Sequence, residues 1–294
     1  MSSTALIEAV VDGVLTGGVY ALMAAGLTLI FGVMDIINIA QGVMVILGAY
    51  LSYELSVHVG IGLLPGLLIT IPLMFALGVA VEFFFMRRLR DQDRTQMSIL
   101  ITYAVAIVIE GILTAIFGVD YQQLQASYVN SSIHVFGFYL ADIYLIGFGL
   151  AVALLIGLYY ALYRTKFGRA VRASLQNRTA ADLIGIDVNR VRTISVGLGV
   201  AVTAVGGMVF GATNSFNPNT GYDLISRLLA IVILGGLGSI GGAMIAAVIL
   251  LVINDVVSVA WSPTWAPLVY FAALVVVLSI RPQGLFGKAA VRAQ

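Results

Sequence analysis

The chain has 294 residues, of which 61% are hydrophobic and only 10% are charged. Soluble domains are about 45–50% apolar and about 25% charged, so this composition excludes an ordinary soluble enzyme. The formal net charge of +1 argues against a nucleic-acid-binding protein, which needs a basic face. The chain contains no cysteine, which excludes disulfides and cysteine-ligated metal sites.

Nine apolar segments follow one another along the chain. A helix needs about 20 mostly apolar residues to cross a bilayer, and the clearest run, Ile143 to Leu162, contains no charge. Because the hydrocarbon core holds no water, a helix satisfies its backbone hydrogen bonds within one segment. We therefore predict an all-α, polytopic transmembrane bundle of about eight or nine segments, which forms a single domain over residues 1–294. The segments are expected at about residues 10–31, 40–57, 62–86, 97–118, 142–163, 193–213, 225–241, 243–260 and 266–280.

Two interruptions between apolar segments predict broken helices that border a solute path. The first, FGVMDIINIAQG, places polar side chains between two apolar runs; its candidate path residues are Asp35, Asn38 and Gln41. The second, ILGGLGSIGG, is rich in glycine; its candidates are Gly235, Gly236, Gly238 and Ser239. Non-helical backbone at membrane depth is tolerated only against protein or a water-filled cavity. Close helix packing through small residues is the alternative explanation for the glycines.

Few ionisable residues lie inside the apolar segments. Arg227 follows Asp223 by four residues, which places both side chains on one helix face. The two residues either pair at the interface or line the solute path, since a charge inside a membrane is costly and is a functional candidate. The same alternatives apply to Asp35, Glu110 and Asp255. Glu110 lies well inside its segment and is a candidate for the path, whereas Asp255 lies near a helix end, where its carboxylate can reach water.

Lysine and arginine residues cluster in three places, and all but one of the 15 lie at residues 87–94, 164–192 and 281–292. Short cytoplasmic loops collect basic residues, so these stretches are expected on the cytoplasmic side. The loop at residues 119–141 contains neither lysine nor arginine and is expected outside, and alternation back along the chain places the N-terminus outside. The segment at residues 225–241 is short. If it spans, the chain crosses the membrane nine times and the C-terminal basic cluster is cytoplasmic. If it only dips into the membrane and returns, that cluster would lie on the wrong side.

Residues 164–192 form the longest polar stretch, which is basic and has helical potential, with Gly185 as a helix stop. Such a stretch forms either a membrane-surface helix held by anionic lipid or a docking helix that fits a groove in a cytoplasmic partner. An ion-coupled secondary transporter, with Glu110 as a proton carrier, has no use for a docking helix. His58 and His134 lack metal-ligand spacing, and GxxxxGK[ST] is absent, so we expect no metal, no cofactor and no enzymatic activity.

Four stretches carry a family resemblance over nearly the whole chain. They are Gly17 to Gly42, Thr165 to Arg192, Leu229 to Ile245 and Ile280 to Gly287. With these motifs in this order, the chain resembles the membrane permeases of branched-chain amino-acid ABC importers of the LivH type. The resemblance implies a multi-pass protein of the bacterial inner membrane that works by alternating access. It also leaves open a permease for urea or another small polar solute.

The resemblance further implies a set of partners. A second permease subunit, identical or homologous, completes the path; two cytoplasmic ATPase subunits drive it, and an extracytoplasmic solute-binding protein delivers the solute. The stretch at residues 164–192 looks like the cytoplasmic coupling loop of this family. The residues that it would place at the ATPase interface are Arg169, Ala180, Ala181 and Gly185. The chain departs from the family pattern at Thr179, where an acid is common, and at Gln41, where histidine is common.

Overall fold

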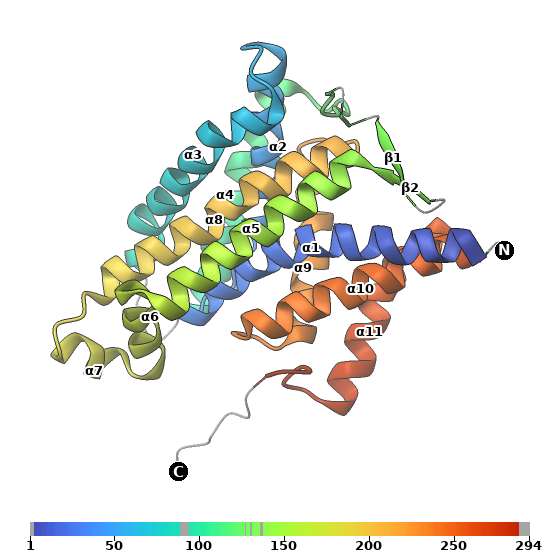
Figure 1. Ribbon diagram of the computed structural model, residues 1–294. Helices are drawn as coiled ribbons and strands as arrows, with labels where there is room; N and C mark the ends of the chain where they lie inside the picture. Colours follow the sequence, from blue (N-terminus) through green and yellow to red (C-terminus); the bar gives the residue numbers. More distant parts are fainter. Residues whose placement is uncertain (1–2, 89–93, 127, 130, 136–137, 288–294) are drawn as a thin grey trace.

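A computed structural model describes the chain except for residues 1–2, 89–93, 127, 130, 136–137 and 288–294. The prediction of a polytopic helical bundle is confirmed, and each of the nine apolar segments forms a helix (Figure 1). Seven helices in the described part are long and apolar enough to cross a membrane. The nine are α1 (Ser3–Met34), α2 (Gln41–Val57), α3 (Leu63–Phe84), α4 (Arg94–Phe117), α5 (Asp142–Arg164), α8 (Val188–Thr213), α9 (Thr220–Gly235), α10 (Ile240–Ala260) and α11 (Ala266–Ile280).

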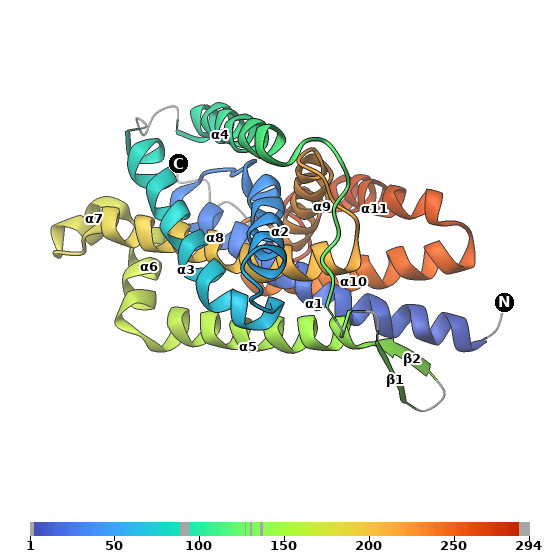
Figure 2. The same ribbon diagram turned by 90° about the horizontal axis from the view of Figure 1, so that it is seen from above.

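Shorter elements lie between and beyond these helices. The basic stretch folds into α6 (Lys166–Gln176) and α7 (Arg178–Leu183), and 3-10 turns occupy η1 (Met86–Arg88) and η3 (Pro263–Trp265). The loop before α5 contains a small antiparallel hairpin of β1 (Ser132–Val135) and β2 (Phe138–Ala141), in which Ser132 pairs with Ala141. The hairpin lies beside the N-terminal half of α1, at the opposite end of the bundle from α6 and α7 (Figure 2).

The bundle has two ends, which we name by their contents. The end that carries α6 and α7 is called the basic end, and the end with the N-terminus of α1 and the hairpin is called the opposite end (Figure 1). α1 and α10 run antiparallel: Gly13 packs against Val252 near the opposite end, and Gly32 packs against Gly238 near the basic end. Of the predicted basic clusters, Arg90, Lys288 and Arg292 lie outside the described residues.

α2 and α9 have only 17 and 16 residues. At 1.5 Å per residue they are about 25 Å long, which is less than the hydrocarbon core of about 30 Å. Non-helical stretches at residues 35–40 and 214–219 precede them, and their first turns meet, since a Cβ added at Gly42 would lie 2.1 Å from the carbonyl oxygen of Gly221. Each of these two passages through the bundle therefore combines a non-helical stretch with a short helix.

The position of the end of α9 shows whether this short helix passes from one end of the bundle to the other, which the sequence left open. Leu285 donates its backbone N–H to the carbonyl oxygen of Leu234 at 2.8 Å, which ties the chain after α11 to the last turn of α9. Phe286 also borders a cavity together with Gly168 and Arg172 of α6. The C-terminal end of α9 and the segment after α11 thus both lie at the basic end, as nine passages require.

Burial separates an inner group of helices from an outer ring. In the most apolar stretch of 18 residues in each helix, 83% of the residues of α1 and 89% of those of α8 are buried. The corresponding shares for α4, α5 and α11 are only 22%, 22% and 11%. Glycines allow the inner helices to approach closely: a Cβ added at Gly26 would lie 2.6 Å from the carbonyl oxygen of Gly199, and one at Gly207 would lie 2.2 Å from that of Val45. Small residues are the usual means of close helix packing in membranes.

Candidate functional site: two cavities along one helix

The break between α1 and α2 holds three predicted path residues in two different environments. Asn38 and Gln41 are fully buried; the Nδ2 of Asn38 donates to the Oε1 of Gln41 at 3.0 Å, and the Nε2 of Gln41 donates to the carbonyl oxygen of Gly199 at 2.8 Å. Asp35 is exposed and has a positive φ of 52°. Its carboxylate lies 3.7 Å from the guanidinium of Arg178, at the start of α7. Asp35 therefore lies at the basic end, beside the candidate coupling loop.

Glu110 lies on the outer helix α4 and is half-buried. Its Oε2 accepts a hydrogen bond of 2.5 Å from the hydroxyl of Tyr222, in the first turn of α9. Tyr222 also packs its ring near Tyr103 of α4. The structure thus joins Glu110 to the first turn of α9, which packs on the first turn of α2 where Gln41 lies.

The glycine-rich break lies between α9 and α10. Gly236 and Gly238 have φ values of 97° and 82°, which L side chains rarely adopt, and the Oγ of Ser239 accepts from the N–H of Gly242 to cap α10. Gly235 packs directly on the first turn of α10, where an added Cβ would lie 2.4 Å from the nitrogen of Ala243. The break therefore needs glycine for two reasons, backbone conformation at Gly236 and Gly238 and close approach at Gly235.

Gly238 and Ser239 border a cavity of about 510 Å³ at the basic end. α1 contributes Thr28 and Gly32 to its wall, and α6 contributes Arg172. The guanidinium of Arg172 donates to the carbonyl oxygen of Leu162 and stacks over the ring of Tyr163, so α6 is fixed to the end of α5. We call this the inner cavity.

The candidate coupling loop presents apolar side chains to its surroundings. Asn177 caps α7 by accepting from the N–H of Ala180, and Gly185 ends the turn with a φ of 85°. Leu183 and Ile184 are 83% and 74% exposed. Of the four residues expected at an ATPase interface, Arg169, Ala180 and Gly185 are exposed. Ala181 is buried on the inward face of α7.

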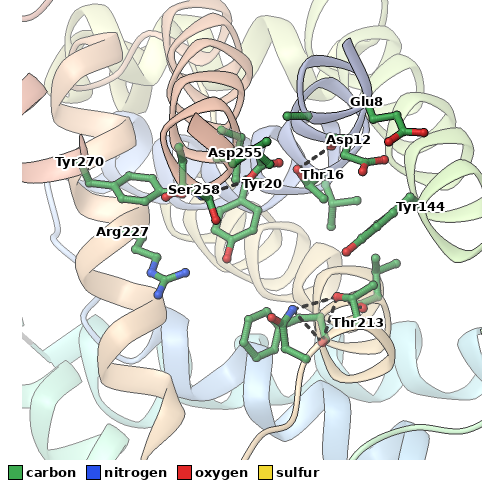
Figure 3. A pocket seen from close by; sticks show the side chains of 18 of the residues that line it. Glu8, Asp12, Thr16, Tyr20, Tyr144, Thr213, Arg227, Asp255, Ser258 and Tyr270 are labelled. Carbon is green, nitrogen blue, oxygen red and sulfur yellow. Dashed lines mark hydrogen bonds between the residues drawn. The ribbon is translucent and has the colours of Figure 1, made fainter. Parts of the chain in front are cut away.

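A second cavity, of about 400 Å³, lies in the half of the bundle toward the opposite end, and we call it the outer cavity. α1, α5, α8, α9, α10 and α11 enclose it (Figure 3). Its wall is polar and charged, with Arg227 of α9 on one side and the acidic residues of α1 on the other (Figure 3). The polar residues that line it are Glu8, Asp12, Thr16, Tyr20, Tyr144, Thr213, Asn214, Arg227, Asn254, Asp255, Ser258 and Tyr270.

One helix, α1, borders both cavities. Residues up to Met23 face the outer cavity, and residues from Thr28 onward face the inner cavity. The residues between them are buried, and at Gly26 the backbone of α1 touches that of α8. The two cavities share no lining residue. In this conformation a packed layer of α1 and α8 separates them.

The sequence indicated Arg227 and Asp255 as candidates but did not predict that they line one cavity. It also did not indicate Tyr20 and Tyr270, which lie near Arg227. One signal was available, because Glu8, Asp12, Thr16 and Tyr20 recur every four residues and so form a polar stripe on one face of a helix. No comparable pattern points to Tyr270, which lies on α11 and meets Arg227 only through tertiary packing: the guanidinium lies 5.8 Å from the centre of the ring.

Comparison with known proteins places this architecture in a family. At 34% identity the chain is similar to a probable branched-chain amino acid transport permease protein LivH of Methanocaldococcus jannaschii, covering 78% of this chain and 74% of that one. It is also similar to the high-affinity branched-chain amino acid transport system permease protein LivH of Escherichia coli K12, at 29% identity over 94% of both chains.

Three further comparisons concern a relative, a solved structure and a family model. The permease protein BraD of the high-affinity branched-chain amino acid transport system of Pseudomonas aeruginosa is 26% identical over 96% of both chains. Among solved structures, PsaBC from Streptococcus pneumoniae in complex with Fab aligns with a TM-score of 0.49 and 12% identity, covering 92% of this chain and 91% of that chain. The family model described as the branched-chain amino acid transport system permease component matches residues 9–278. The chain therefore belongs to the permease-component family of branched-chain amino acid transport systems.

Proposed function

We propose that this chain is the permease subunit of an ATP-binding-cassette importer that moves branched-chain or related amino acids across the inner membrane of a bacterium. One observation carries the mechanism: two cavities lie along α1, and a packed layer of α1 and α8 separates them. A solute that moves from one cavity to the other needs this layer to repack, which is alternating access. The substrate class is taken from the names of the relatives, of which the chain covers 94% and 96%.

Alternating access needs a partner that prefers one packing over the other, since a ligand shifts a two-state equilibrium only by its differential affinity. We assign this task to two cytoplasmic ATPases that bind α7. Leu183 and Ile184 are more than 70% exposed on a basic surface, and exposed apolar side chains of this kind fit a groove in a partner. The ion pair of Asp35 with Arg178 connects α7 to the break before α2, which gives motion of α7 a route to the inner helices.

The remaining partners are a second permease subunit and an extracytoplasmic solute-binding protein. The outer helices α4, α5 and α11 expose most of their apolar surface, which lipid and a second permease subunit would cover. The solute-binding protein would dock at the opposite end, onto the loops at residues 119–126 and 214–219. These loops form one surface, because Gln122 and Phe216 exchange backbone hydrogen bonds of 2.8 and 2.9 Å.

Copurification and uptake test this proposal together. The tagged chain, extracted from its source membrane in mild detergent, should bring with it two ATPases, and the assembled importer in liposomes should take up labelled leucine when ATP is supplied on the cytoplasmic side. Leu183→Asp places an unpaired charge in the docking groove, which costs several kcal/mol, so ATPase copurification and uptake should both be lost.

Thr179→Asp is the matched control, because Thr179 is an exposed position of the same short helix where the family commonly has an acid. It should assemble and transport as the unmodified chain does. Leu183→Asp importers that retain their ATPases and their uptake would contradict the assignment of α7 as the docking element. ATP-driven uptake of urea but not of leucine would contradict the proposed substrate class.

A further inference from the structure

The outer cavity combines charges of both signs inside a membrane segment of the bundle. Charged groups in the membrane are costly and mark solute or ion paths, and they are retained where they pair with each other or with a ligand. Arg227 supplies the positive charge from α9, and Asp12 and Asp255 supply negative charge from α1 and α10. Figure 3 shows Arg227 and Asp12 on different sides of the cavity, with Tyr20 between them.

The side of the cavity at Arg227 presents hydrogen-bond donors. The guanidinium of Arg227 interacts electrostatically with the phenol groups of Tyr20 and Tyr270. It also interacts with the carboxylate of Asp223, one turn earlier on α9. Tyr270 is fully buried, and its hydroxyl has no hydrogen-bond partner among the described residues. A buried polar group without a partner costs free energy, which a ligand can recover by pairing with it. A guanidinium beside the hydroxyl of Tyr20 and over the ring of Tyr270, together with the unpartnered Tyr270 hydroxyl, is a set of donors suited to a carboxylate.

The other side of the cavity presents acceptors. One carboxylate oxygen of Asp12 is buried and has no hydrogen-bond partner among the described residues. Asp255 accepts from the side-chain amide of Asn254 at 3.0 Å and also interacts with the hydroxyl of Thr16 on α1, which leaves part of the acceptor capacity of its two oxygens for a ligand. Two carboxylates with spare acceptor capacity are suited to an ammonium group, which has three donors. Glu8 lies farther out along the same stripe of α1.

Apolar side chains complete the wall. Val19, Met23, Val209 and Leu251 line the cavity and are each no more than 5% exposed. Unbranched, flexible side chains such as that of Met23 adapt to ligands of different shapes. The cavity thus offers a carboxylate site, an ammonium site and an apolar surface within one volume of about 400 Å³.

We propose that the outer cavity is a binding site within the permease for a zwitterionic α-amino acid with an apolar side chain. Arg227, Tyr20 and Tyr270 bind the carboxylate, and Asp12 and Asp255 bind the ammonium. A net-neutral zwitterion satisfies both sides, whereas a simple anion leaves the aspartates without a ligand group and a simple cation leaves Arg227 without one. Uncharged solutes such as urea leave both sides unpaired. This assignment rests on the proposed function and makes the permease itself selective, in addition to any solute-binding protein.

Equilibrium binding to the copurified permease–ATPase complex in nanodiscs, without a solute-binding protein, tests the site directly. Labelled leucine should bind, and 3-methylbutylamine and 4-methylpentanoate, which each lack one of its two charged groups, should compete at least about ten-fold more weakly. Arg227→Gln should weaken leucine by about ten-fold or more without weakening the amine. Asp255→Asn should weaken leucine and the amine without weakening 4-methylpentanoate.

Controls separate the site from stability. Glu54→Gln removes a carboxylate at the far end of α2, where Glu54 pairs with His58 at 3.0 Å, and should leave all three affinities unchanged. If Arg227→Gln fails to assemble, Tyr270→Phe removes only a hydroxyl and should still weaken leucine without affecting the amine. Wild-type leucine affinity in either assembled variant, or equal affinity of the wild type for leucine and both analogues, would overturn the proposal.

The same measurements distinguish this inference from the proposed function. ATP-driven leucine uptake by the complete importer, together with no binding of leucine in nanodiscs, overturns the zwitterion site and leaves the importer function intact. Leucine binding that is sensitive to Arg227→Gln, together with no ATP-driven uptake, supports the site and contradicts the importer function.

Discussion

At the scale of single residues, the glycine-rich break before α10 shows why neighbouring glycines have different roles. An added Cβ at Gly242 would lie 2.1 Å from the carbonyl oxygen of Gly235 and 2.8 Å from the Cβ of Phe286, so no side chain fits there. An added Cβ at Gly241 would meet nothing within 4 Å. Both belong to the first turn of α10, and the sequence alone gives no reason to treat them differently.

The pair Gly242→Ala and Gly241→Ala tests this difference. Gly242→Ala forces the end of α9 away from α10 and should lower the free energy of unfolding by about 1–3 kcal/mol, the usual cost of overpacking. Gly241→Ala should leave it unchanged or raise it slightly, because alanine restricts the unfolded chain. Unfolding of the purified chain in mixed micelles measures both variants. Equal stability of the two would show that the contact between Gly235 and Gly242 is not tight.

At the scale of elements, the break between α1 and α2 depends on α4 for its position. The Oγ1 of Thr102 accepts from the backbone N–H of Ile39 at 3.2 Å and lies 3.2 Å from the carbonyl oxygen of Ile37. Thr102 is fully buried, and the same hydroxyl can also donate to the carbonyl oxygen of Ser98 in its own helix. One side chain of α4 therefore replaces part of the hydrogen bonding that the broken helix has lost.

Thr102→Val keeps the shape of the side chain and removes this hydroxyl. The N–H of Ile39 then loses its partner, which should cost about 1–3 kcal/mol in the free energy of unfolding. Thr102→Ser retains the hydroxyl and should keep most of that stability, so the two variants separate hydrogen bonding from packing. The same micelle unfolding measurement applies. A Thr102→Val variant as stable as Thr102→Ser would contradict the role of α4 in holding the break.

At the scale of the whole molecule, nine passages determine which surfaces share a side of the membrane. Gln176 and Gln283 are exposed at the basic end, on α6 and after α11, whereas Ser132 and Thr264 are exposed on the hairpin and before α11. The basic end collects most of the arginines, so it should be cytoplasmic. The fold thus gathers these arginines at one end, and their charge orients that end toward the cytoplasm.

Single cysteines in this cysteine-free chain test that orientation. An impermeant thiol reagent should label Gln176→Cys and Gln283→Cys only from the cytoplasmic side, and Ser132→Cys and Thr264→Cys only from the external side. Labelling of Gln176→Cys and Gln283→Cys from different sides would mean that the short helix α9 does not complete a passage. Reversal of all four would invert the topology while leaving the fold intact.

The sequence by itself determined the nine helical segments, the two breaks and the helical basic stretch, because hydropathy, glycine content and charge are local properties of the chain. Only the tertiary structure decided which helix faces meet. It brings Tyr20, Arg227, Asp255 and Tyr270 from four helices into one cavity, and the periodicity within a single helix cannot indicate the face of another helix that it will contact.

The same limit applies to the basic stretch. Its sequence predicted helices and a stop at Gly185, but not that Ala181 is buried while Leu183 and Ile184 are exposed, because that depends on how α7 packs against the rest of the chain. Asp35 likewise reads as a polar residue between two membrane segments, and only its approach to Arg178 places it at the basic end. Local patterns decide what each segment becomes, and contacts between distant segments decide where each side chain lies.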